Sequence, residues 1–572
     1  MENNPAGKLR DKQPFRFLDF HTENPLNGLP DTVQVRYLCH YLKDLGAVAV
    51  MEEPSYFDRD FLAQHQEFYC RSATGYSNTC RRLHFFKKRG ISRDRLLQAL
   101  GGDEAVHAAL QEDYLGFIVL RPIHSAPLGR TVLAWYEDRQ HKSTPRIIKP
   151  SRENYVHIAG LRLMVFGLSW QQQDHATGTC ATVGLWSVLQ AKAYHPPGPT
   201  TPDINRGARH RMSYGERTFP FRGLDLYSVM DAIHAQPGME PFLIESDIPR
   251  PSGTDPVGFT HTNFVHLVTA LIRGGFPVLL CGQAAGRHHI NCVIGFRSCA
   301  PDPTNRLQIL NCQEEGIRYI YLHDDSIGPN ARFQIRNVPC PDIPPVCEYE
   351  RVELYLDPPE YSSARDAARH PKNDLWHYVF VPQFLIVAVP ESLRTTPATL
   401  LWSGMDRMSL LAGSYFCLTE AIANISDPQF SFSCQFVRLT DYLGEVLEKT
   451  LMDTPEARAK LRTNLAEEMP IMSQYIGLVR IGFRHSDLLE YMPLVDILHD
   501  TTDSDQNHPV FATVCFQEIG YKLVCAGKKN ASIIIDSLPR KHNVLHNGTI
   551  LEQRITSLPV HILKEFGKVI RA

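Results

Sequence analysis

Residues 171–180 read QQQDHATGTC and lead directly into an apolar segment without proline that extends to Tyr194. The apolar side chains of this segment suit a buried helix, which places Cys180 in its first turn. Unpaired backbone N–H groups and the positive end of the helix macrodipole favour a thiolate there. Because the thiolate is the nucleophilic form of cysteine, Cys180 is the candidate nucleophile among the fourteen cysteines of the chain.

The residues around Cys180 suit a site for acyl chemistry. The neighbours are small and leave room for the backbone of a substrate: Ala176, Thr177, Gly178, Thr179 and Ala181. An upstream glutamine side chain, together with the N–H of Cys180, is placed to donate to a developing oxyanion. Gln172 and Gln173 both remain candidates for that role.

A histidine and an acid follow on two strand-like segments. In residues 286–296, strand alternation places His289, Asn291 and Val293 on one face, opposite His288, Ile290, Cys292 and Ile294. His289 therefore lies on the less apolar face, where it can act as a base. The next segment, 319–322, ends at Asp324 and Asp325. An acid there would orient the histidine and stabilise its imidazolium form.

Metal and nucleotide chemistry have little support in the sequence. His288 and Cys292 share a strand face but are about 13 Å apart at the usual rise per residue, and His289 faces the other way. No Cys-x-x-Cys pair and no phosphate-binding loop are present. We therefore expect no metal and no organic cofactor.

The order of the elements indicates an α+β fold. The segments 180–194, 224–234 and 261–272 are predicted helices, and 195–223 is a predicted loop. Short β-rich segments follow at 276–280, 289–296, 307–310, 318–322, 331–335, 351–355 and 377–389. Helices followed by a succession of strands predict a largely antiparallel sheet.

A chain of 572 residues is too long for one core, and we expect three domains. Residues 1–150 are predicted to form a mixed α/β domain with a helix at 33–45 and a strand at 114–122. The domain that carries the site spans 151–395. Residues 396–572 are predicted to form an α+β domain with helices at 441–452 and 455–469 and strands at 475–483 and 511–514. The two flanking domains are candidates for binding a substrate or a protein partner.

Composition limits the setting. The formal net charge of −3 gives no general attraction to nucleic acid. No apolar stretch approaches the roughly 20 residues that a membrane span needs. The N-terminal residues lack the features of a secretory signal, so a cytoplasmic protein is the expectation. Fourteen cysteines in a chain of this length do not indicate a disulfide scaffold.

At these motifs the sequence resembles the papain-like cysteine peptidase superfamily, and most closely its bacterial double-glycine (bacteriocin-processing) peptidase branch. Gln173 precedes Cys180 by seven residues, Phe276-Pro277-Val278 matches the family's first strand, and His289 precedes Gly295-Phe296 by the family's interval. The resemblance, which covers about 230 residues, implies Cys180 as nucleophile, His289 as base, Asp324 as orienting acid and Gln173 as oxyanion donor. It also implies a peptide or isopeptide substrate and no cofactor.

The sequence departs from the family at three positions and leaves two other functions open. Ala181 replaces a glycine after the nucleophile, His288 replaces a glycine before the histidine, and Asp325 replaces a proline. An acyl transferase of the transglutaminase type uses the same thiol, base and acid. An inactive papain-like scaffold that binds a protein partner is the third interpretation.

Overall fold

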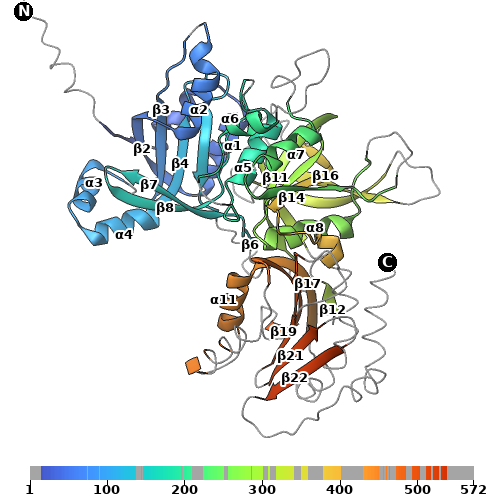
Figure 1. Cartoon of the computed structure of the whole chain (residues 1–572). Coiled ribbons are helices and arrows are strands. Elements are labelled where there is room, and N and C mark those ends of the chain that lie inside the picture. The colour runs from blue at the N-terminus through green and yellow to red at the C-terminus, as the bar shows by residue number, and fades with distance from the viewer. Residues whose placement is uncertain are drawn as a thin grey trace, which may run out of the picture.

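The computed structural model describes most of the chain between residues 14 and 537. The described ranges are 14–73, 75–88, 91–136, 144, 146–174, 176–194, 197–208, 223–249, 256–284, 286–299, 307–309, 317–340, 349–357, 378–400, 429–449, 455–456, 459, 463, 472–484, 492–502, 511–516, 519–526 and 530–537. Three regions follow one another: an N-terminal unit (blue), a central unit (green to yellow) and a C-terminal sheet (orange to red) (Figure 1).

The N-terminal unit is a five-stranded antiparallel sheet with helices. The strands, in spatial order, are β1 (Arg16–Asp19), β2 (Ala47–Tyr56), β3 (Cys80–Lys87), β4 (Tyr114–Leu120) and β5 (Leu128–Leu133). The helices are η2 (Pro25–Gly28), α1 (Val33–Asp44), α2 (Arg59–Glu67), η3 (Tyr69–Arg71), α3 (Arg93–Leu100) and α4 (Glu104–Asp113). Each α-helix begins after a side-chain cap, provided by Thr32, Asp58, Ser92 and Asp103 in turn. The predicted helix at 33–45 and strand at 114–122 are confirmed.

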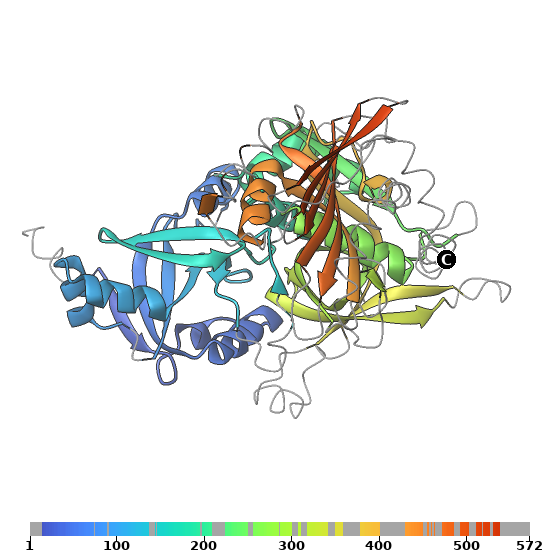
Figure 2. The ribbon, with the colours of Figure 1, turned by 90° about the horizontal axis from the view of Figure 1, so that it is seen from below.

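The chain crosses between the first two units before it reaches the site. Strand β6 (Arg146–Ile147) pairs with the central sheet. The hairpin of β7 (Arg152–Ile158) and β8 (Leu161–Gly167) then returns, and its alternate residues are buried against the N-terminal unit. Figure 2 shows this hairpin extending across the N-terminal unit, away from the central sheet.

The central unit contains a sheet that closes on itself. Its strands are β9 (Met239–Glu245), β10 (Val278–Ala284), β11 (Arg287–Ser298), β13 (Ile317–Asp324), β14 (Gly328–Pro339), β15 (Glu350–Leu356) and β16 (Val379–Pro390). Strands β10, β11, β13, β14, β15 and β16 pair in this order, and β10 also pairs with β16, so the sheet is closed; β9 pairs with residues 384–390 of β16, on the edge opposite β10. Every pairing is antiparallel.

The helices of the central unit are α5 (Cys180–Leu189), α6 (Thr201–Gly207), α7 (Leu226–His234) and α8 (His261–Arg273). Helix α5 packs on β10 and β11 at Gly184, where a Cβ atom would lie 3.2 Å from Leu279 and 3.3 Å from Ile290. A larger side chain at this position would hold the helix away from the sheet. The absence of a side chain at Gly184 therefore permits the close approach of the two elements.

The structure confirms an α+β fold with antiparallel central strands and corrects three expectations. The sheet is closed, and it includes β9, which the sequence did not predict. The predicted loop 195–223 contains α6, which begins with a capping box between Thr200 and Asp203; residues 195–196 and 209–222 lie outside the described residues. The predicted strand at 307–310 is β12 (Leu307–Ile309), which pairs with the C-terminal sheet.

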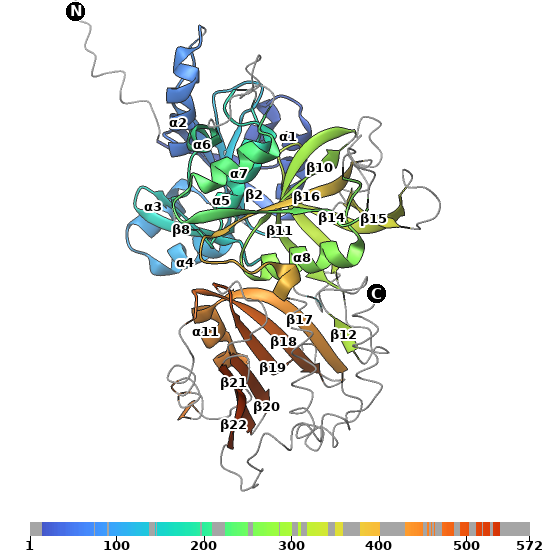
Figure 3. The same ribbon diagram turned by 45° about the vertical axis from the view of Figure 1, so that its right-hand side comes forward.

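The C-terminal sheet has seven strands and lies against α8 (Figure 3). Its order is β12, β17 (Gln429–Arg438), β18 (Tyr475–Arg484), β19 (Met492–Asp500), β20 (Phe511–Phe516), β21 (Ile519–Ala526) and β22 (Asn530–Ser537), with α11 (Leu439–Lys449) after β17. The rings of Phe276 and Tyr475 join it to the central unit at 4.8 Å between centroids. The predicted helix at 455–469 lies largely outside the described residues. None of the helices in the described parts is long and apolar enough to cross a membrane.

Substituting Gly282 is expected to disrupt the closed sheet. A Cβ atom there would lie 1.9 Å from the carbonyl oxygen of Val381, at the irregularity in the β10–β16 pairing. Gly282→Ala should therefore lower the free energy of unfolding by about 2 kcal/mol or more, measured by chemical denaturation. Gly28→Ala is the control, because nothing lies within 4 Å of a Cβ atom there. Equal stability of the two variants would contradict this account of the closure.

Candidate active site

Cys180 is the first residue of α5, at the edge of the core. The nine residues that follow it in the helix are all buried, whereas Cys180 is partly exposed. The N-cap residue Thr179 makes no side-chain cap, since its hydroxyl group contacts that of Thr182 instead. The backbone N–H groups of the first turn are thus not occupied by a capping side chain, and they remain able to stabilise a thiolate or an oxyanion.

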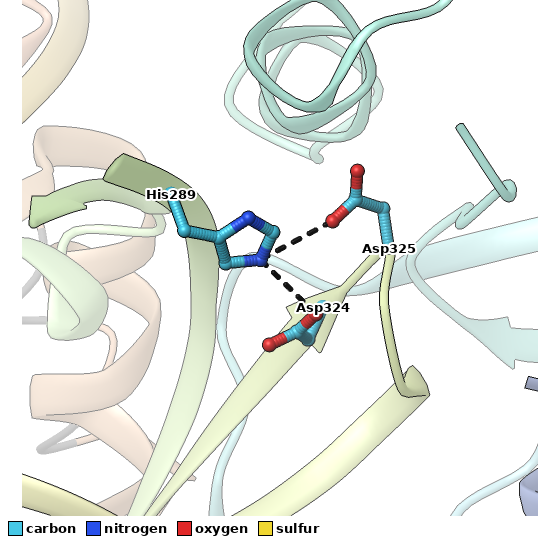
Figure 4. A group of neighbouring side chains, drawn as sticks. All are labelled: His289, Asp324 and Asp325. Atoms are coloured by element: carbon cyan, nitrogen blue, oxygen red, sulfur yellow. Dashed lines mark hydrogen bonds and ion pairs between the residues drawn. The ribbon is translucent and has the colours of Figure 1, made fainter. Parts of the chain in front are cut away.

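His289 lies near the start of β11, opposite Gly282 of β10. Its Nε2 atom is 3.2 Å from Oδ1 of Asp324 and 3.3 Å from Oδ1 of Asp325. Figure 4 shows one ring nitrogen directed at both carboxylates and the other directed away from them. The imidazole side chain is 11% exposed and both aspartates are buried, so all three groups interact largely without water.

Cys180 and His289 lie beside each other. Burial by itself lowers the pKa of His289, but Asp324, the Cys180 thiol and Asp325 together raise that pKa well above its usual value. Because Nε2 faces the two aspartates, Nδ1 is the ring nitrogen that is left for the thiol. The pairing of Cys180 with His289 and Asp324 that the sequence predicts is therefore present in space.

Both predicted acids contact the histidine. Oδ1 of Asp324 also accepts a hydrogen bond from the N–H of Ser326, and the indole N–H of Trp170 donates to the backbone oxygen of Asp324. Burial raises the pKa of Asp325 to about 7, against the opposing influence of His289. Both Asp324 and Asp325 therefore contact the one imidazole. Asp324 differs in that its Oδ1 atom also accepts a hydrogen bond from Ser326.

Two further polar residues belong to the surroundings of Asp324 and of the His289 face of β11. Asn291 lies two residues after His289 on the same face of β11 and is fully buried. Burial and then Asp324 raise the pKa of Tyr378, whose hydroxyl group also interacts with Asn291. The alternation of β11 was the available signal for Asn291. Tyr378 precedes β16 and carries no local signal of its position.

The two candidate glutamines have different environments. The side-chain oxygen of Gln172 accepts from the N–H of Leu128, and its backbone N–H donates to the carbonyl group of Leu128. Gln173 is only partly buried, and among the described residues its side chain makes no hydrogen bond. Gln173 is therefore the glutamine that is free to turn toward an oxyanion, although no hydrogen bond joins it to Cys180.

The loop before Cys180 is organised by Asp174. Its Oδ1 atom accepts the N–H groups of Ala176, Thr177 and Gly178 at 2.6–3.0 Å. Its other oxygen lies 3.6 Å from the guanidinium group of Arg121, and both side chains are 2% exposed. Burial would raise the pKa of Asp174, but Arg121 and the three N–H groups hold it below its usual value. The ionised carboxylate thus fixes the conformation of the loop.

Arg121 belongs to the N-terminal unit and follows β4. Its guanidinium group also donates to Oε1 of Gln64 and to the carbonyl oxygens of Ala126 and Gln172. Asn205 of α6 donates to the carbonyl group of Thr177 on the opposite side of the loop. The N-terminal unit and α6 therefore hold the loop between them. Sequence reasoning missed Arg121 because nothing in its neighbourhood marks a contact with a loop fifty residues later.

The side chains of His289, Asp324 and Asp325 are of types that bind metal ions. Among the described residues, the group of potential ligands whose atoms lie within 4.8 Å of one another consists of His289, Asp324 and Asp325. This differs from the arrangement around His288 and Cys292 that the sequence analysis considered and rejected.

Loss of the Arg121 side chain is expected to destabilise the protein strongly. Arg121→Met leaves Asp174 buried without its counter-ion, so the free energy of unfolding should fall by about 3–5 kcal/mol in chemical denaturation. Arg36→Met is the matched control, because its partner Asp31 is 79% exposed and such pairs contribute about 1 kcal/mol or less.

The double variant tests the cause of this effect. Asn can accept the three loop N–H groups but carries no charge, so adding Asp174→Asn to Arg121→Met should cause little further loss. A loss equal to the sum of the two single variants would contradict a role of Arg121 as the counter-ion.

The pH dependence of the site should respond to Asp324. An imidazolium is lost as pH rises through its pKa, and Asp324 raises that pKa. Asp324→Asn should therefore shift the alkaline limit of histidine-dependent thiol reactivity to lower pH, by about 1–3 pH units. The rate of Cys180 alkylation is measured as a function of pH, with His289 present and in the His289→Ala background. The difference between the two rates is the histidine-dependent reactivity. Asp31→Asn makes the same charge change at an exposed position and should leave the limit unchanged.

Comparison with known proteins does not assign the chain to a family. No family model matches the sequence, and no curated protein or solved structure is significantly similar to it. The site is therefore interpreted from its own geometry.

Proposed function

We propose that the central unit is a thiol hydrolase with Cys180 as nucleophile, His289 as base and Asp324 as the orienting acid. The observation that carries the proposal is that the imidazole ring of His289 lies between the Cys180 thiol and the Asp324 carboxylate. One side of the ring lies beside a cysteine at a helix N-terminus, and the other side contacts buried carboxylates. This is the arrangement that activates a thiol and recovers its proton.

The first step is attack on a carbonyl group. Nδ1 of His289 takes the proton of the Cys180 thiol, while the Nε2–H group donates to Asp324. The thiolate adds to the carbonyl carbon, and the resulting oxyanion accepts from the N–H groups of the first turn of α5 and from the Gln173 side chain. Nδ1 then gives its proton to the leaving amine, and an acyl thioester remains on Cys180.

The second step releases the acid. A water molecule gives a proton to Nδ1 as its oxygen attacks the thioester, and the thiolate leaves and recovers a proton. No cofactor takes part in either step. An amine in place of water would make the same site an acyl transferase, and product analysis with an added amine distinguishes the two outcomes.

The substrate is proposed to be a peptide or isopeptide bond. The support is the resemblance of the motifs around Cys180 and His289 to papain-like peptidases, together with the small residues before the nucleophile. The N-terminal unit, through Arg121, has a supporting role in this site. An inactive scaffold is the competing interpretation, and the experiment below separates it from the proposal.

An electrophilic thiol probe at neutral pH tests the nucleophile. Cys180 should be modified at least about tenfold faster than Cys70, although Cys70 is the more exposed thiol. The reason is that, of these two thiols, Cys180 alone combines a helix N-terminus with an adjacent imidazole. Site-resolved mass spectrometry of the labelled protein measures both rates in one sample.

The control removes the base and leaves the thiol. His289→Ala should reduce the labelling of Cys180 to the rate of an ordinary thiol, whereas His288→Ala should not change it. If Cys180 in the wild-type chain is labelled no faster than Cys70, the thiol hydrolase proposal is wrong and the scaffold interpretation remains.

A further inference from the structure

Asp325 is not explained by the proposed chemistry. One carboxylate is enough to orient His289. Asp324 provides that carboxylate, and its Oδ1 atom is itself held by a hydrogen bond from the N–H of Ser326. Asp325 is almost completely buried, and apart from Nε2 of His289 at 3.3 Å and the nearby N–H groups of Asp325 and Ser326, its oxygen atoms have no donor among the described residues. Oδ2 of Asp324 likewise forms no well-aligned hydrogen bond among the described residues, although the Tyr378 hydroxyl group interacts with the Asp324 carboxyl group. Buried carboxylate oxygens with so few donors can accommodate another partner, such as an ion.

The ligand atoms have the spacing of a metal centre. Zinc binds imidazole nitrogen and carboxylate oxygen at about 2.0–2.2 Å, so adjacent ligands of a tetrahedral ion are about 3.3 Å apart. The distances from Nε2 of His289 to Oδ1 of Asp324 and of Asp325 are 3.2 Å and 3.3 Å, and all three atoms lie within 4.8 Å of one another. Small side-chain rotations would complete the set.

The ligand types select the class of ion. One imidazole and two carboxylates suit a divalent transition metal of the zinc type, and their charges balance the two charges of the ion. The cluster also has support behind it: Trp170 and Gln34 donate to the backbone oxygens of Asp324 and Asp325. Such outer contacts hold carboxylate ligands in place.

We propose that His289, Asp324 and Asp325 bind a zinc-type divalent ion that switches off the thiol site. The ion takes the lone pair of Nε2, so the remaining ring proton resides on Nδ1, the nitrogen beside Cys180. A ring in that state has no free lone pair to accept the Cys180 proton, and the thiol stays unreactive. The inhibitory part of this proposal rests on the proposed thiol chemistry; the metal site itself does not.

Metal binding is tested in the full chain without the nucleophile. The variant Cys180→Ser is titrated with Co²⁺ by calorimetry and electronic absorption, followed by displacement with Zn²⁺. We expect one ion per chain without a sulfur-to-cobalt charge-transfer band, and binding at least about tenfold weaker when Asp325→Asn is added. His288→Ala is the matched histidine control and should bind normally. Circular dichroism confirms that each variant is folded.

Inhibition is tested in the chain that retains Cys180. Zn²⁺ should slow probe labelling of Cys180 at least about tenfold, a chelator should restore it, and Asp325→Asn should abolish the effect of the ion. Binding that needs Cys180, or no binding to the folded Cys180→Ser variant, overturns the metal site. Binding to that variant together with an unreactive Cys180 in the metal-free wild type preserves the metal site and rejects the hydrolase.

Discussion

The close approach of α5 to the closed sheet sets the geometry of the whole site. Gly184 lies one helical turn after Cys180, and its missing side chain lets the helix rest on Leu279 and Ile290. Ile290 follows His289 in β11. The contact of Gly184 with Ile290 therefore fixes the position of the Cys180 thiol relative to the His289 imidazole. Helix and strand are rigid elements, so a shift of a fraction of an ångström at Gly184 is transmitted to the thiol and the imidazole.

The N-terminal unit supports the site on two sides. On one side Arg121 neutralises Asp174, which folds the loop before the nucleophile. On the other side α1 packs on the turn that follows Asp324: Gln34 donates to Asp325, and Tyr37 donates to the carbonyl group of Pro329. The proposed chemistry lies in the central unit, but the positions of its loop and its acid depend on contacts with the first 130 residues.

The sequence predicted the features of the site that have local signatures. Cys180 opens a helix after small residues, His289 lies on an alternating strand, and Asp324 ends the next strand; each pattern is contained in about a dozen residues or fewer. Closure of the sheet through β10 and β16, the added strand β9, and the roles of Arg121 and Trp170 depend on partners more than forty residues away. No periodicity or spacing records such contacts. The buried state of Asp325, which makes it more than a turn residue, is likewise a property of the assembled sheet.

Closure of the sheet also has a consequence for the order of events during synthesis. Strand β10 is held between β11 and β16, and β16 ends at Pro390, roughly 100 residues after His289. At ribosomal rates this stretch takes about 5–20 seconds to make. Throughout that interval one edge of β10 has no partner, and the imidazole lacks the final strand that encloses it, including Phe380 beside its ring. A nascent chain therefore carries an incomplete site until β16 is made and the central sheet closes.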